Sequence, residues 1–100
     1  MMLPWDYKKC PVCGAELSIQ YYCIDLIECE RFEHCLRCDY DYQSAYGEEQ
    51  WIIGSWLIHQ HYSDSVNKVV RTRKKIERAL FWARRNFRKR HGKYRKGGIR

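Results

Sequence analysis

The sequence has no long run of apolar residues, only two prolines and no cysteine after Cys38. The longest apolar candidate, residues 51–58, is eight residues long, whereas a membrane-spanning helix needs about 18 or more. We therefore expect no membrane span. The first residues reach Lys8 and Lys9 without an apolar run, which is not the layout of a secretory signal, so we expect a cytoplasmic chain.

The distribution of cysteine limits how the chain can be cross-linked. All six cysteines lie between Cys10 and Cys38, so no intrachain disulfide can hold the C-terminal part. A reducing cytoplasm favours thiolates that are available to a metal over disulfides. With 100 residues the chain has room for one domain, or one small domain with an appended arm.

Charge divides the chain into two parts. Residues 1–62 carry four Lys/Arg and ten Asp/Glu, a net charge of −6, whereas residues 63–100 carry fifteen Lys/Arg and two Asp/Glu, a net charge of +13. The overall +7 hides this asymmetry. We expect an acidic, cysteine-bearing head at 1–62 and a basic tail at 63–100.

The head has the pattern of β-hairpins. A tight turn at residues 8–14 is followed by a β-favouring run at 21–27, and a second turn at 35–39 is followed by period-two alternation at 40–46. Residues 48–62 fit a buried strand and a short buried helix about equally. Gly54 and the β-branched residues favour the strand.

The tail is predicted to be a long amphipathic helix. Ser63, Asp64 and Ser65 are suitable N-cap residues, and neither proline nor glycine follows until Gly92. We expect a flexible cationic end after Gly92. The helix should bury its apolar stripe against Trp51, Ile53, Trp56 or Leu57, and the fold class is therefore α+β. The stripe consists of Val66, Val69, Val70, Ile76, Leu80, Ala83 and Phe87.

Four cysteines have the spacing of a metal site. Cys10 and Cys13 form one pair, Cys35 and Cys38 form another, and the whole is C-x2-C-x21-C-x2-C. Each pair can place two thiolates on one turn, and two such turns supply four sulfurs in a tetrahedron suitable for Zn²⁺. Iron bound by four sulfurs is the chemical alternative. The alternative without a metal is that the four cysteines are free buried thiols or form disulfides.

The motif C-P-V-C-G followed by C-L-R-C-D resembles the zinc ribbon family, whose two knuckles are commonly written C-P-x-C-G and C-x-x-C-G. The resemblance covers roughly residues 8–46 and implies that Cys10, Cys13, Cys35 and Cys38 hold one structural Zn²⁺ ion. Asp39 stands where the family usually has glycine, and Asp tolerates the left-handed region.

The remaining cysteines and two histidines have less specific patterns. Cys23 and Cys29 lack pair spacing and are predicted to be packed or free thiols. The alternatives are a role as substitute ligands, or a second metal bound together with His34. His59 and His61 lie on one side if this segment is a strand. Together with Asp64 they are candidate ligands of a second, catalytic metal. The simpler interpretation is that they are surface or interface histidines. No nuclease pattern surrounds them.

The basic helix has a cationic face opposite the apolar stripe. Fifteen cations in 38 residues indicate a partner with dense negative charge, of which nucleic acid is the commonest. Trp82 lies amid the cations, where it can stack on a base. The alternative is that it stacks on its neighbours Arg78 and Arg85 or packs on the head. The predicted contact residues are Lys68, Arg71, Lys75, Arg78, Trp82, Arg85, Arg88 and Lys89.

These patterns predict a non-enzymatic zinc protein that binds DNA or RNA through its basic helix, as an accessory factor in transcription or RNA metabolism. A four-cysteine site is closed to substrate, which disfavours an enzyme. The alternative is a regulator whose acidic head docks on a protein partner such as a polymerase, a nuclease or a ribosomal protein.

Overall fold

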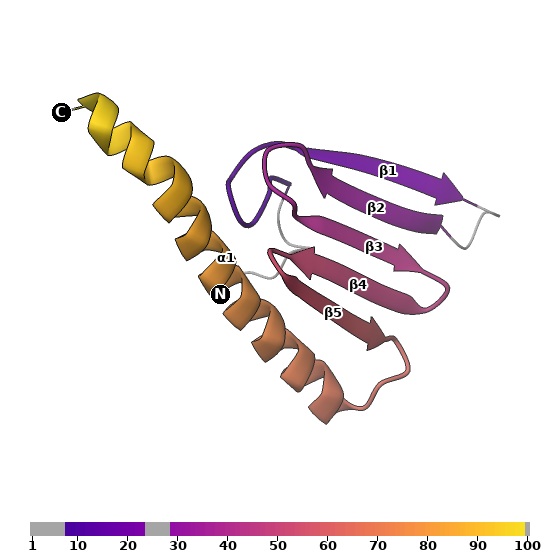
Figure 1. The fold of residues 1–100 in the computed structure, drawn as a ribbon. Coiled ribbons are helices and arrows are strands. Elements are labelled where there is room, and N and C mark those ends of the chain that lie inside the picture. The colour runs from indigo at the N-terminus through magenta and orange to yellow at the C-terminus, as the bar shows by residue number, and fades with distance from the viewer. Residues whose placement is uncertain (1–7, 24–28, 100) are drawn as a thin grey trace.

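The computed structural model describes residues 8–23 and 29–99. It confirms the α+β class, with an antiparallel sheet followed by one long helix (Figure 1). Part of the predicted strand at 21–27 lies outside the described residues. The elements are β1 Leu17–Cys23, β2 Cys29–Cys35, β3 Asp41–Ala45, β4 Glu48–Ile53, β5 Trp56–His61 and α1 Val66–Ile99.

The sheet is a meander in which the five strands pair in sequence order. Two of its turns place residues at positive φ, which matches the twist of antiparallel strands. Tyr46 and Gly47 have φ of 53° and 76° between β3 and β4, and Gly54 has φ of 61° between β4 and β5. The segment 48–62 is therefore extended, as favoured from sequence, but forms two strands because Gly54 permits a tight turn in its middle.

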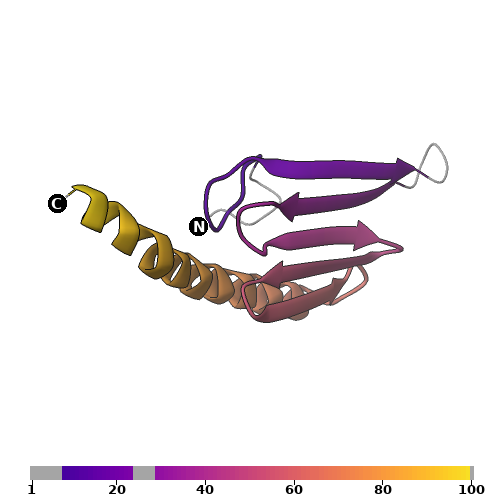
Figure 2. The ribbon, with the colours of Figure 1, turned by 45° about the horizontal axis from the view of Figure 1, so that its top comes forward.

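Helix α1 packs on one face of the sheet at its β4 and β5 side (Figure 2). Trp51, Ile53 and Ile58 from this inner face are 0–4% exposed, and Ile76 and Leu80 of the helix are fully buried. The predicted packing against Trp51 and Ile53 is confirmed. Trp56 and Leu57, which were also expected in that contact, are 40% and 66% exposed.

The helix begins where the capping residues predict. The hydroxyl of Ser65 accepts a hydrogen bond from the Lys68 N–H (3.5 Å), and its carbonyl accepts one from the Val69 N–H (3.0 Å). The helix continues through Gly92 to Ile99, where a flexible cationic end was expected. Within the described residues no helix has the length and apolar character to cross a membrane.

The buried stripe of α1 differs from the predicted one at its N-terminal end. Val66 and Val70 are 78% and 44% exposed, because the sheet reaches only the middle of this long helix. Thr72 and Ala79 are buried instead. Thr72 tolerates burial because its hydroxyl donates a hydrogen bond to the Lys68 carbonyl (2.8 Å).

The sheet also buries one carboxyl group. Glu33 on β2 is 0% exposed, and its only ion pair in the described chain is with the Arg31 Nε atom at 3.4 Å. Burial raises the pKa of Glu33 above its usual range, and the nearby Arg31 charge only partly offsets the effect.

Candidate metal centre and basic helix face

The structure brings the four predicted cysteine ligands together. The sulfur atoms of Cys10, Cys13, Cys35 and Cys38 all lie within 4.8 Å of one another. The closest pairs join the two turns, with Sγ–Sγ distances of 3.4 Å for Cys10–Cys38 and for Cys13–Cys35. A tetrahedral site with metal–sulfur bonds of about 2.3 Å has edges of about 3.8 Å. The four sulfurs therefore fit a tetrahedral metal ion.

Both turns have the backbone arrangement that supports thiolate ligands. The Cys10 sulfur accepts a hydrogen bond from the Val12 N–H, and the Cys35 sulfur accepts bonds from the N–H groups of Arg37 and Cys38, all at 3.4 Å. Such N–H···S bonds orient the ligands and stabilise their negative charge. Two turns distant in sequence thus converge on the same local structure.

A backbone hydrogen bond closes each turn. The Cys10 N–H donates to the Ala15 carbonyl (2.6 Å), and the Cys35 N–H donates to the Tyr40 carbonyl (3.0 Å). Gly14 has φ of 79°, and a Cβ atom there would meet no other atom within 4 Å, so glycine is favoured by the backbone alone. Asp39 was expected to occupy the left-handed region, but among the described non-glycine residues only Tyr46 has positive φ.

The pKa values of the cluster's thiols are shifted in opposite directions. Burial raises the pKa of Cys10 to about 11, and burial raises that of Cys38 as well. Burial also acts on Cys35 and is the largest single effect there, but the N–H···S bonds from Cys38 and Arg37, together with the hydrogen bonds from the Cys13 and Cys38 thiols, outweigh it and lower the pKa of Cys35. Four sulfurs in contact, of which those of Cys10 and Cys35 belong to buried residues, repel one another as thiolates, and a divalent cation at their centre would remove that penalty.

The helix is attached to both cysteine turns. The Arg84 Nε–H donates a hydrogen bond to the Pro11 carbonyl (2.6 Å), and the Arg37 guanidinium lies 5.3 Å from the centre of the Phe87 ring. Arg84 is therefore part of the scaffold between helix and metal site. A pocket of about 490 Å³ lies beside this contact and is lined by residues that include Cys38, Asp39, Lys89 and Arg90.

The prediction for Cys23 and Cys29 is wrong. They are neither free thiols nor substitute ligands, because they are linked by a disulfide bond. The pairing of β1 with β2 places Cys23 directly opposite Cys29 at the end of the ladder. Strand register, which the spacing of six residues does not reveal, brings them together.

The cationic face of α1 points away from the sheet. All seven predicted cations are exposed. Lys68 pairs with Asp64 at 3.4 Å, whereas in the described part of the chain no carboxylate pairs with the other six. These six cations are Arg71, Lys75, Arg78, Arg85, Arg88 and Lys89.

Trp82 is exposed among these cations and is not part of the buried core. It is 44% exposed, and the Arg85 guanidinium lies 5.5 Å from its ring centre. Phe81, which the sequence reasoning did not single out, is 52% exposed and meets Trp82 edge to face at 5.4 Å. The sequence does carry a signal for this pair, because Phe81 and Trp82 are adjacent aromatic residues and neither belongs to the apolar stripe.

His59 and His61 lie on one side of β5, as expected for a strand, but their carboxylate neighbour is not the predicted Asp64. Both imidazoles contact Glu48. The Asp64 carboxylate instead accepts a hydrogen bond from the His61 backbone N–H (3.1 Å) and pairs with Lys68. Cross-strand pairing of Glu48 with His61 explains the difference.

No protein-family model, curated protein or solved structure matches this chain. The architecture and the site geometry are therefore the basis for assigning a function. They define an α+β chain with a four-cysteine cluster able to hold a metal ion.

Proposed function

We propose that the protein is a non-enzymatic nucleic-acid-binding protein with one structural zinc ion, in which the metal centre and the sheet hold the basic helix for contact with phosphates. Zinc is favoured because it prefers four-coordinate tetrahedral sites with cysteine thiolate ligands, and such a closed site has no position for a substrate. Cys10, Cys13, Cys35 and Cys38 would hold the ion.

One observation carries the nucleic-acid proposal: the apolar side of α1 is buried on the sheet while its cations face solvent with few acidic partners. An ion-paired face would have its charge neutralised within the molecule. Here six exposed cations lack a carboxylate partner among the described residues. A regular row of such cations along a helix suits the regular spacing of phosphates.

The first test is the salt dependence of binding by the full-length protein to duplex DNA, duplex RNA and single strands. We expect Arg78→Gln/Arg85→Gln to weaken binding and to lower the slope of log K against log salt by about 2, since each lost phosphate contact removes roughly one unit. Fluorescence anisotropy over a range of salt concentrations measures both quantities.

The matched control is Lys8→Gln/Lys9→Gln, which removes the same net charge from two exposed residues of the head. It should leave the slope close to that of the unmodified protein. Binding that does not respond to salt, or equal losses in the two double variants, would contradict a helix-based contact.

Trp82 supplies a second prediction, which concerns single strands. Stacking of a base on an exposed aromatic ring contributes about 1–3 kcal/mol, so Trp82→Ala should weaken single-strand binding by roughly 5- to 150-fold. Trp56→Ala is the control, because Trp56 is similarly exposed, at 40% against 44%, but lies on the sheet. Equal effects of the two substitutions in a quantitative anisotropy titration would show that Trp82 does not stack on bases.

A further inference from the structure

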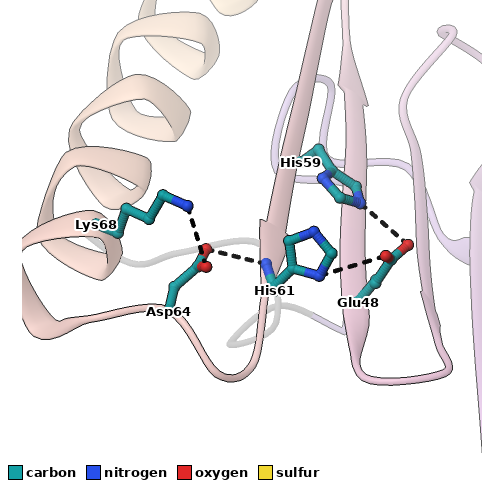
Figure 3. A network of polar contacts seen from close by, with 5 residues as sticks. All are labelled: Glu48, His59, His61, Asp64 and Lys68. Atoms are coloured by element: carbon teal, nitrogen blue, oxygen red, sulfur yellow. Dashed lines mark hydrogen bonds and ion pairs between the residues drawn. The ribbon is translucent and has the colours of Figure 1, made fainter.

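A second group of metal-ligand side chains lies on the outer face of the sheet, away from α1 (Figure 3). His59 and His61 alternate along β5 and so project to the same side, and Glu48 of β4 is the register partner of His61. The strand pairing alone places two imidazoles and one carboxylate side by side. The group is at the end of the sheet opposite the cysteine turns (Figure 1).

The side chains already converge at distances suited to one ion. His59 Nε2 lies 3.1 Å from Glu48 Oε2, and His61 Nδ1 lies 3.3 Å from Glu48 Oε1. One nitrogen of each ring and a carboxylate oxygen fall within 4.8 Å of one another. The two rings meet edge to face with their centres 4.9 Å apart.

The adjoining turn holds this arrangement in place. Asp64 accepts the hydrogen bond from the His61 backbone N–H, and Lys68 from the first turns of α1 lies 3.4 Å from the other carboxylate oxygen (Figure 3). The end of β5 is therefore tied to the beginning of the helix. Supports of this kind restrict the ligand backbone and lower the cost of ordering it when an ion binds.

We propose that Glu48, His59 and His61 form a second metal site, for a divalent transition-metal ion such as Zn²⁺. Imidazole suits zinc, nickel and copper, whereas Ca²⁺ and Mg²⁺ prefer oxygen ligands. Two histidines and one glutamate are an established ligand set for zinc, and three protein ligands leave a position for water or an anion. The side chains are 43–49% exposed, so an ion can enter directly from solvent.

The test is isothermal titration of Zn²⁺ into full-length protein whose four-cysteine site has first been filled with one zinc per chain. We expect one further zinc to bind. His59→Ala and His61→Ala should each weaken this second event at least about 100-fold, and Glu48→Gln about 10-fold. Circular dichroism of each variant checks that the fold is retained.

His34→Ala is the matched control. His34 lies on the same face of the sheet, is half-exposed and also contacts a carboxylate, Asp41 at 3.7 Å, but it has no second histidine beside it. Its removal should leave the second zinc in place. No second zinc in the unmodified protein, unchanged affinity in His59→Ala, or an equal loss in His34→Ala would each overturn the proposal. None of these outcomes bears on nucleic-acid binding.

Discussion

Cys35→Ser is expected to abolish metal binding at the four-cysteine site and to lower the melting temperature by roughly 15–30 °C. Cys35 is 1% exposed and its sulfur accepts two backbone hydrogen bonds, so a hydroxyl there has neither the size nor the charge to replace a thiolate. An ion present at 1,000 times its Kd contributes about 4 kcal/mol to folding, and 1 kcal/mol shifts the melting temperature by roughly 4–8 °C in a chain of this size.

The effect should extend beyond the cysteine turns. Cys10 and Cys35 belong to the same buried cluster as Trp51 and Leu80, so disorder at the turns would loosen the contact between helix and sheet. Metal content measured by mass spectrometry and thermal unfolding followed by circular dichroism test the prediction together. A chelator added to the unmodified protein should reproduce the lower melting temperature.

The control for this experiment is Cys23→Ser/Cys29→Ser. These residues form the disulfide at the far end of β1 and β2, so the double variant should retain one metal ion at the four-cysteine site. Full metal content in Cys35→Ser, or its loss in the disulfide variant, would show that the cluster does not hold the ion as proposed.

Leu80→Ala is expected to lower the free energy of unfolding by about 2–5 kcal/mol, because it leaves a cavity where the helix packs on the sheet. Leu80 is fully buried with Ile76 and Ala79 against a sheet face that includes Trp51 and Ile53. This cavity weakens the contact of α1 with the sheet, whereas the attachments of Arg84 and Phe87 to the cysteine turns remain. Urea unfolding followed by circular dichroism measures the change.

Val66→Ala and Val70→Ala are the matched controls. Both positions belong to the same apolar stripe in the sequence, but they are 78% and 44% exposed in the structure. Each substitution should change the free energy of unfolding by no more than about 0.5 kcal/mol, as is usual at exposed positions. If Val66→Ala lowered the free energy of unfolding as much as Leu80→Ala, the helix would have to pack on the sheet through a different face or segment.

The metal cluster was predictable because its information is local. Cys10 and Cys13 lie on one turn, and Cys35 and Cys38 lie on another. In each turn the two residues between the cysteines set the geometry. The helix was predictable for a similar reason, since Ser65 caps it through residues within one turn. The cationic face follows from helical period alone.

The errors arose where separate elements of the fold meet. The Cys23–Cys29 disulfide and the contacts of Glu48 with His59 and His61 depend on strand register. The hydrogen bond of Arg84 to the Pro11 carbonyl connects positions 73 residues apart. None of these contacts is encoded in the spacing of neighbouring residues.

The sequence by itself determined the α+β class and the four cysteines on two turns. It also determined the separation of an acidic head from a basic tail, residues 63–100, with a net charge of +13. These properties follow from the residues at each turn, from the spacing of apolar residues along helix and strand, and from the charge of each segment. All three can be recognised from residues that are close together in the sequence. Tertiary structure decided which apolar residues of α1 are buried and which carboxylate meets the paired histidines. Those outcomes depend on how the sheet pairs and how far it extends beneath the helix, because packing and register are set by contacts between separate elements.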